Sequence, residues 1–190
     1  MNLNRPWLPN AITLGRLSAV PLIVWLLTVY NDGGVWISAI TALIYLAAAL
    51  TDLLDGHLAR RYNLVSNLGA FLDPLADKLL AASALIMLLP LGRVPAWVVF
   101  LILAREMAVT GLRAIAAEKG LVISASESAK KKTLAQNIAL FCLLWHHPLL
   151  WADTALVGTV ILYVALAVTY WSGLIYFLDY RRAVREIPSN

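Results

Sequence analysis

The chain has 190 residues, of which 61% are hydrophobic and only 14% are charged, and its mean hydropathy is +0.77. Soluble domains are roughly 45–50% apolar, so this composition excludes an ordinary soluble domain and indicates an integral membrane protein. The formal charge of +4 fits anionic lipid, nucleic acid or a phosphate-bearing substrate as a partner, and the single cysteine, Cys142, excludes a disulfide framework.

Six apolar segments follow one another along the chain, and each is close to the ~20 residues that a membrane-spanning helix needs. Short stretches rich in turn-forming residues separate them. The segments are Asn10–Tyr30, Gly34–Asp55, Leu68–Leu91, Val94–Ala117, Thr133–Trp151 and Thr154–Asp179. We therefore predict an all-α integral membrane protein with six transmembrane helices in one domain, residues 1–190.

Basic residues gather on one side of the six predicted spans, and the loops of the other side contain only Arg93. The first group comprises Arg5, Arg60, Arg61, Lys119, Lys130, Lys131, Lys132, Arg181, Arg182 and Arg185. Because cytoplasmic loops are enriched in Lys and Arg, we expect both termini and the loop between the second and third segments to face the cytoplasm.

Four aspartates lie where the second segment ends and the third begins. Asp52 and Asp55 are three residues apart and Asp73 and Asp77 are four apart, so each pair shares one helix face. A loop of about a dozen residues between the segments would bring the two pairs to the same depth. Carboxylates this close must be protonated or bind cations, and hard oxygen ligands suit Mg²⁺, Mn²⁺ or Ca²⁺. Shared carboxylates can hold two ions about 3.5–4 Å apart, an arrangement used in phosphoryl chemistry.

Small residues and one arginine accompany the aspartates. Gly56 and Gly69 have no Cβ and would let a ligand approach the helices closely, and Ala59 keeps the same wall low. Arg60 offers a guanidinium fork that can hold a diphosphate or pair with an aspartate. The segment is therefore a candidate site for a diphosphate beside divalent cations.

Together these residues form the pattern Asp52-x2-Asp55-Gly56-x2-Ala59-Arg60-x8-Gly69-x3-Asp73-x3-Asp77, which resembles the complete signature of the CDP-alcohol phosphotransferase family. The resemblance implies six transmembrane helices around a polar cavity open to the cytoplasm. It implies transfer of a phosphatidyl-type group from a CDP-linked lipid to an alcohol, with release of CMP. It also implies that the four aspartates bind two divalent cations, Mg²⁺ or Mn²⁺, that Asp77 is the general base, and that the glycines, the alanine and the arginine contact cytidine diphosphate.

The first segment contains "PNAITLGRL", in which Pro9, Asn10, Thr13 and Arg16 resemble the first helix of the same family. By that resemblance, Asn10 and Thr13 would help to hold the nucleotide. Arg16 is expected to contact the phosphate of the acceptor.

Basic residues of the fourth and fifth segments indicate that the acceptor alcohol carries a phosphate. Arg105 and Arg113 are eight residues apart and roughly share a helix face, with Thr110 between them. Lys130 and Lys132 precede the fifth segment. Cationic groups that converge from two helices need an anionic partner, which favours glycerol 3-phosphate over serine, free inositol or choline.

The same stretches resemble the bacterial phosphatidylglycerophosphate synthase branch of the family. They read Ala104-Arg105-Glu106, Thr110-Gly111-Leu112-Arg113 and Ala129-Lys130-Lys131-Lys132-Thr133, with Ala129 at a position where glycine is expected. The resemblance implies CDP-diacylglycerol and glycerol 3-phosphate as substrates, with Arg105, Thr110, Arg113, Lys130 and Lys132 at the acceptor phosphate. It also implies a homodimer in the inner membrane of a bacterium, surrounded by lipid and with no nucleic-acid partner.

Other interpretations stay open. Arg105 and Glu106 could form a structural ion pair, and Lys131 could anchor the chain at anionic headgroups. Lys78 lies about 100° away from Asp77 around a helix, so it could reach toward the membrane surface or support a neighbouring side chain. The acceptor could instead be inositol phosphate, serine or a lipid alcohol. A cation or proton transporter is a further alternative, but it would need acidic residues at several depths.

Overall fold

The computed structural model describes residues 7–30, 34–62, 67–118, 127–149 and 151–185, with side chains except at 7–12, 52–71, 73 and 127–131. Within this part of the chain there are six helices. They are α1 Trp7–Val29, α2 Gly34–Tyr62, α3 Asn67–Met87, α4 Ala96–Glu118, α5 Glu127–Trp145 and α6 Thr154–Arg185. Each predicted apolar segment coincides with one helix, which confirms the all-helical prediction.

Several helices extend past the apolar segments that predicted them, and the extensions of α2 and α5 bear on the site. α2 continues to Tyr62 instead of ending at Asp55, and α5 begins at Glu127 instead of Thr133. The additional turns are polar, and hydropathy marks only the part of a helix that avoids water. The predicted loop of about a dozen residues between the aspartate pairs is therefore wrong, because only residues 63–66 separate α2 from α3.

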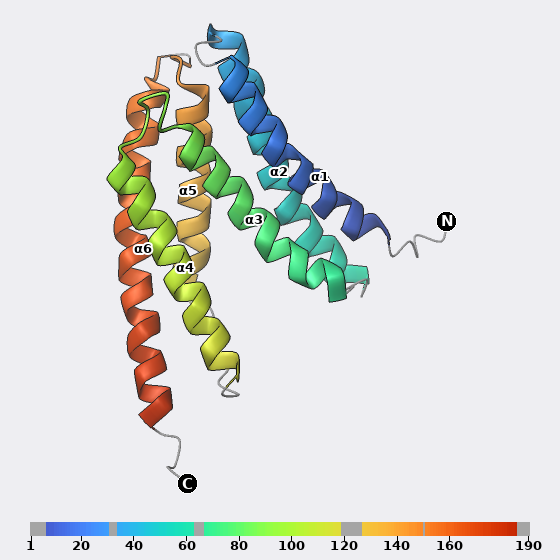
Figure 1. The fold of residues 1–190 in the computed structure, drawn as a ribbon, viewed down its shortest axis with the longest axis vertical. Helices are drawn as coiled ribbons and strands as arrows, with labels where there is room; N and C mark the ends of the chain where they lie inside the picture. The colour runs from blue at the N-terminus through green and yellow to red at the C-terminus, as the bar shows by residue number, and fades with distance from the viewer. Residues whose placement is uncertain (1–6, 31–33, 63–66, 119–126, 150, 186–190) are drawn as a thin grey trace.

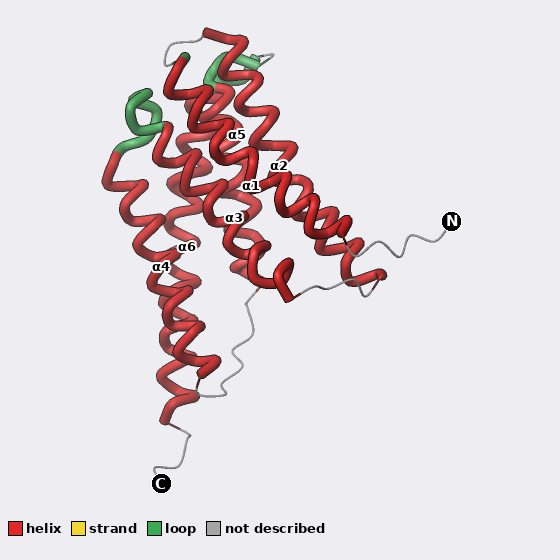
Figure 2. Tube along the Cα trace, turned by 45° about the vertical axis from the view of Figure 1, so that its right-hand side comes forward, coloured by secondary structure: helices red, strands yellow, loops and turns green. Residues whose placement is uncertain are grey.

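Consecutive helices run in opposite directions through the bundle (Figure 1). The C-terminal ends of α2, α4 and α6 and the N-terminal ends of α1, α3 and α5 therefore lie at the same end. α1 packs on α2 and α3, and α4 packs on α6, while α5 contacts α2, α3 and α6 and joins the two groups (Figure 2). This arrangement places the aspartate-bearing ends of α2 and α3 at the same end of the bundle as the basic end of α6.

The interior of the bundle is apolar and receives side chains from all six helices. Fully buried examples, one from each helix in order, are Ile23, Tyr45, Leu85, Ile102, Leu140 and Leu162. α5 and α6 pack closely at Gly158 of α6, where an added Cβ would lie 2.9 Å from Cys142 Cβ of α5. Small residues at such positions let two helix backbones approach, which is how helices in membranes gain packing energy.

Local signals in the sequence explain where two of the helices end and begin. After α3, Gly92 has a φ of 66°, its N–H donates to the Leu89 carbonyl and the next N–H donates to the Leu88 carbonyl. This is a Schellman turn, which favours glycine at the left-handed position. Before α6, Asp153 accepts hydrogen bonds from the N–H groups of residues 155 and 156 and so caps that helix.

Arg93 ties three parts of the bundle together at the end away from the aspartates. Its Nη1 donates to the carbonyls of Leu143 and Leu144 at 3.1 and 2.9 Å, and its Nη2 donates to Ser38 Oγ at 3.1 Å. The last carbonyls of a helix have no donors within the helix, so a guanidinium there acts as a C-terminal cap for α5. The one basic residue predicted for this side is thus engaged inside the protein.

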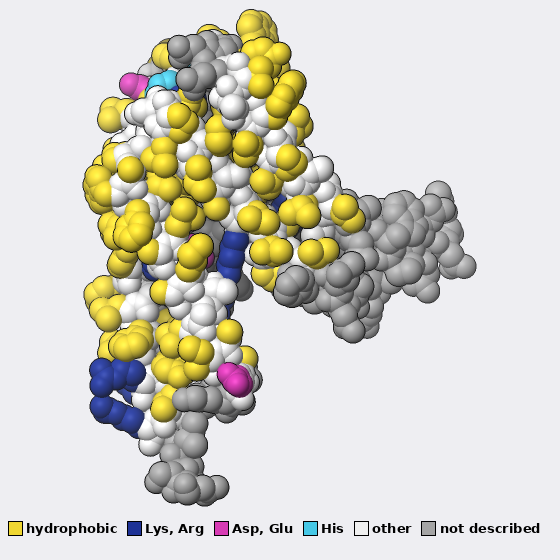
Figure 3. All heavy atoms as spheres, in the orientation of Figure 1, with side chains coloured by type: hydrophobic (Ala, Val, Ile, Leu, Met, Phe, Trp, Pro, Cys, Tyr) yellow, Lys and Arg dark blue, Asp and Glu magenta, His cyan; other side chains and the backbone are white. Residues whose placement is uncertain are grey.

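The described surface exposes more large apolar side chains than the surface of a soluble protein normally does. Trp36, Phe100 and Trp171 are 80%, 69% and 65% exposed, and hydrophobic side chains cover most of the face in Figure 3. Within the described residues, Gly34–Thr51 of α2 and the whole of α6 are long and apolar enough to cross a membrane. The fold is therefore consistent with a membrane protein.

Candidate functional site

The two aspartate pairs lie on adjacent helices. Asp52 and Asp55 belong to α2 and Asp73 and Asp77 to α3, and these helices pack against each other. Because both pairs are helical, each keeps the predicted common face. The side chains of Asp52, Asp55 and Asp73 lie outside the described part of the structure, and Asp77 is half-buried. The dinuclear metal centre therefore stays a prediction.

The extension of α2 gives the signature a geometry that the sequence analysis did not foresee. Positions 52, 55, 56, 59 and 60 follow the spacing i, i+3, i+4, i+7 and i+8 within one continuous helix. That spacing traces a single stripe along a helix face. Six further residues predicted to contact the nucleotide or the acceptor are described only as positions on α1, α2, α3 and α5. They are Asn10, Gly56, Ala59, Arg60, Gly69 and Lys130.

α1 brings Thr13 and Arg16 to the interior beside α2. Both are buried, with 2% of each residue exposed, and Arg16 Nε donates to the Ala48 carbonyl at 3.3 Å. Ala48 is one helical turn before Asp52. The structure thus places Arg16 beside the end of α2 that carries Asp52. Arg105, the other arginine predicted at the acceptor phosphate, lies elsewhere and contacts α6.

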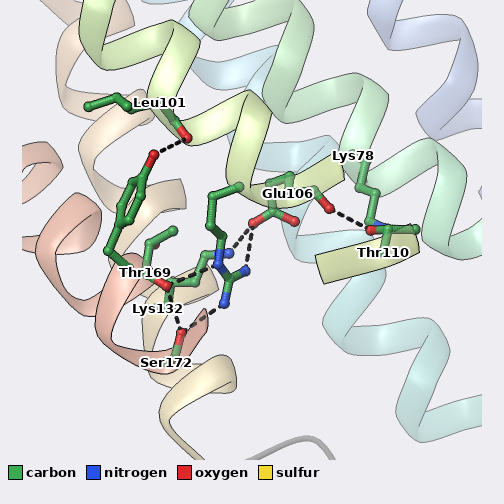
Figure 4. A network of polar contacts seen from close by, with 9 residues as sticks. Lys78, Leu101, Glu106, Thr110, Lys132, Thr169 and Ser172 are labelled. Atoms are coloured by element: carbon green, nitrogen blue, oxygen red, sulfur yellow. Dashed lines mark hydrogen bonds and ion pairs between the residues drawn. The ribbon is translucent and has the colours of Figure 1, made fainter. Parts of the chain in front are cut away.

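A group of charged side chains from α4 and α5 forms the best-defined polar centre (Figure 4). One carboxylate oxygen of Glu106, Oε1, accepts hydrogen bonds from both Lys132 Nζ and Arg105 Nη1, the second at 3.4 Å. The side chains of Lys132, Arg105 and Glu106 are 5%, 10% and 26% exposed. Two cations that are nearly excluded from solvent thus share one anion that still reaches it.

Arg105 is also fixed to α6. Its Nε donates to the Thr169 carbonyl at 2.9 Å and its Nη2 to Ser172 Oγ at 2.8 Å, while Ser172 Oγ donates to the same Thr169 carbonyl. Gly173 leaves room for the guanidinium, since a Cβ there would lie 3.2 Å from Arg105 Nε. The ion pair between Arg105 and Glu106, which the sequence left open as an alternative, is present. The α6 partners of Arg105 were not predicted, because that segment carries no motif.

Lys78 connects the aspartate helix to this polar centre. Its Nζ donates to Thr110 Oγ1 at 2.5 Å, and Thr110 Oγ1 donates to the Glu106 backbone carbonyl at 2.7 Å. Lys78 directly follows Asp77, so the bond joins α3 to α4 one residue beyond the last aspartate of the signature. Of the two roles left open for Lys78, the support of a neighbouring side chain is the one that the structure displays.

Arg113 lies two turns beyond Arg105 on α4 and is exposed. Its guanidinium carbon is 5.4 Å from the centre of the ring of Tyr176, a buried residue of α6. A cation above an aromatic face is held without using its hydrogen-bond donors. Arg113 is near enough for its charge to act on Arg105 and Lys132, and it keeps donors available for an anion.

Cationic side chains of α4 and α5 lie near the end of α3 that carries Asp77, the predicted base. Arg105, Arg113 and Lys132, here called the basic cluster, come from α4 and α5, and two of them, Arg105 and Lys132, share the Glu106 carboxylate. Lys78 of α3, which follows Asp77, reaches α4 through Thr110. Lys and Arg side chains also occupy the hollow beside α4 in Figure 3. Such a cluster can bind a phosphate group close to a reacting hydroxyl.

Sequence comparison supplies independent information. The model of the family described as CDP-alcohol phosphatidyltransferase matches residues 6–171. The chain is 40% identical over 179 residues to a CDP-diacylglycerol–glycerol-3-phosphate 3-phosphatidyltransferase of Bacillus subtilis, covering 90% of this chain and 93% of the relative. It is 40% identical over 175 residues to the protein of the same name from Salmonella choleraesuis, covering 89% and 92%. A probable phosphatidylglycerophosphate synthase of Mycobacterium tuberculosis is 41% identical over 184 residues, covering 95% and 83%.

Proposed function

The chain belongs to the CDP-alcohol phosphatidyltransferase family, and on that premise we propose that it transfers the phosphatidyl group of CDP-diacylglycerol to the 1-hydroxyl of glycerol 3-phosphate. The products are phosphatidylglycerophosphate and CMP. The names of relatives that match most of the chain support this reaction. The observation that carries the choice of acceptor is the bond from Lys78 to Thr110, because it joins the helix of Asp77 to the basic cluster.

The aspartates fit divalent cations by the chemistry of their donor atoms. Asp52 and Asp55 share the stripe on α2, Asp73 and Asp77 share a face of α3, and the two helices pack together. These four residues would hold two ions, Mg²⁺ or Mn²⁺, since both prefer carboxylate oxygens. Bound ions would neutralise the diphosphate and the charge that develops on the departing CMP.

Asp77 is the proposed general base. As the 1-hydroxyl oxygen forms a bond to the phosphorus of the phosphatidyl group, the bond from that phosphorus to the CMP oxygen breaks and its electron pair leaves with CMP. The hydroxyl proton passes to Asp77, which needs only to accept it as the new bond forms. Half-burial of Asp77 restricts the access of water, which would otherwise compete with the acceptor.

The remaining predicted contacts divide between the two substrates. The proposed nucleotide contacts are Asn10, Thr13, Gly56, Ala59, Arg60 and Gly69. The proposed contacts to the acceptor phosphate are Arg105, Thr110, Arg113, Lys130 and Lys132. The position of Arg16 against α2, one turn before Asp52, favours a contact to the diphosphate over the acceptor contact expected from the sequence.

The membrane arrangement belongs to the same proposal. We propose one domain with six transmembrane helices around a cavity open to the cytoplasm, embedded in lipid of a bacterial inner membrane as a homodimer. The alternation of helix direction supports it, since it puts the aspartate-bearing and basic helix ends on one side. The exposed apolar side chains support a lipid environment.

A panel of acceptors tests the proposed function. The purified protein in detergent is mixed with CDP-diacylglycerol and one acceptor, and CMP release is measured. Release should require both glycerol 3-phosphate and Mg²⁺ or Mn²⁺, and a chelator should stop it. If serine or inositol phosphate supports release and glycerol 3-phosphate does not, the acceptor assignment is wrong. If no acceptor supports release, the proposed reaction is wrong.

A further inference from the structure

Glu106 occupies the position that a bound phosphate would be expected to take. Its Oε1 is the shared acceptor for Lys132 Nζ and Arg105 Nη1, two of the groups proposed to bind the acceptor phosphate. Lys78 is a third cation whose charge acts on it. A carboxylate and a phosphate both accept charge-assisted hydrogen bonds from ammonium and guanidinium groups. The two anions would therefore compete for Lys132 and Arg105.

The surroundings explain why an anion is needed when the acceptor is absent. Lys132 and Arg105 are 5% and 10% exposed, and two nearly buried like charges without a counter-charge are strongly unfavourable. The Arg105 guanidinium is held by Thr169 and Ser172 of α6, so it does not move away to relieve the repulsion. Glu106 supplies the compensating charge from within the protein.

We infer that Glu106 is a positioning residue that acts as an internal counter-ion, which the acceptor phosphate must displace from Lys132. The inference rests on the proposed function. The 26% exposure of the Glu106 side chain gives the carboxylate an open side toward which it can move. An acceptor without a phosphate has no charge with which to displace Glu106. Glu106 therefore lowers the affinity for every anion but raises the selectivity for phosphorylated acceptors.

Glu106→Gln removes the charge and keeps the shape. We expect its KM for glycerol 3-phosphate to fall about three- to tenfold, the scale of the net contribution of one ordinary hydrogen bond. The inhibition constant of inorganic phosphate, measured in competition with glycerol 3-phosphate, should fall by a similar factor. The KM for CDP-diacylglycerol should not change. A merely structural role would not lower both anion constants while sparing the lipid.

Two further variants complete the experiment. Glu106→Asp retains the charge but withdraws it by one methylene, so its acceptor KM should lie between those of the wild type and Glu106→Gln. Asp179→Asn, which removes an exposed carboxylate of α6 that pairs with Arg182, should leave all constants unchanged. If Glu106→Gln does not fold, Glu106→Asp takes its place: an acceptor KM below that of the wild type supports the counter-ion role, and an unchanged or raised KM contradicts it.

The outcomes separate this inference from the proposed function. A wild-type protein that does not use glycerol 3-phosphate contradicts the proposed function. A wild type that does use it, with an acceptor KM that is unchanged or raised in Glu106→Gln, contradicts only the counter-ion role. If both Glu106 variants fail to fold, Glu106 is a structural ion-pair partner and the inference is wrong.

Discussion

Asp77 has the most demanding proposed role of any single residue, since it is both a predicted metal ligand and the predicted base. Asp77→Asn keeps the size of the side chain but cannot accept the hydroxyl proton. We expect kcat to fall by about 10²–10⁴, the range that general-base catalysis contributes, with little change in the binding of CDP-diacylglycerol. Steady-state kinetics and nucleotide binding measure the two effects.

The control for Asp77 is Asp153→Asn. Asp153 caps α6 at the opposite end of the bundle, and asparagine caps a helix about as well as aspartate. This variant should retain full activity. Normal turnover by Asp77→Asn would show that another group accepts the proton.

Arg113 is a proposed acceptor contact that is exposed and whose guanidinium lies over the ring of Tyr176. Arg113→Ala should raise the KM for glycerol 3-phosphate about tenfold or more, because a hydrogen bond to a charged group is worth roughly 1.5–3 kcal/mol. The KM for CDP-diacylglycerol should change much less. Arg182→Ala, which removes an exposed arginine of α6, is the matched control. Equal effects of Arg113→Ala on both substrates would indicate a structural role.

At the residue scale, the sequence indicated which polar residues lie together better than it indicated their partners. The motifs named Arg105, Thr110 and Lys132, and the structure brings them into one network with Glu106. No motif indicated Ser172 or Thr169, because a hydroxyl or a carbonyl on an apolar helix becomes informative only when another helix brings a charge to it. Lys78 was expected on a different helix face from Asp77, but its partner on α4 could not be predicted from helix geometry alone.

The contact of α5 with α6 leaves no room for a larger side chain at Gly158. Gly158→Ala would place a Cβ 2.9 Å from Cys142 Cβ and from Leu143 Cγ, so the helices must separate or shift. We expect a loss of roughly 1–3 kcal/mol of stability, the usual cost of overpacking. Thermal unfolding in detergent, followed by circular dichroism, measures it.

Gly15→Ala is the matched control for that change. Gly15 lies in α1 with open space around the position of an added Cβ. Alanine there should leave stability unchanged or raise it by about 0.5–1 kcal/mol through its higher helix propensity. A Gly158→Ala protein as stable as Gly15→Ala would contradict the close packing of α5 on α6.

At the element scale, the predicted helices were right in number and order but wrong at polar ends. Hydropathy located the apolar centre of α2 but ended it at Asp55, while the helix continues to Tyr62. The error matters because the continuation puts the signature positions on one helical stripe. The turn at Gly92 and the cap at Asp153 were more predictable, since both depend on a local residue preference.

For the molecule as a whole, composition and the succession of apolar segments predicted six helices, but how these helices pack could not be predicted. Nothing in the sequence indicated that α5 would contact α2, α3 and α6 together. That position allows Lys132 to meet residues of α4 inside the bundle. Nor did the spacing of charges reveal that Arg93 would cap α5, because its partners are backbone carbonyls about fifty residues away.

The proposed reaction involves the whole molecule, because the aspartates and the basic cluster must act on two substrates in one reaction. Glycerol 3-phosphate labelled with ³²P is the most direct probe. With CDP-diacylglycerol and Mg²⁺ or Mn²⁺ present, the label should enter solvent-extractable lipid, and one CMP should be released for each labelled lipid formed. Release of CMP with the label still in water-soluble material would show hydrolysis or a different acceptor, and would contradict the account.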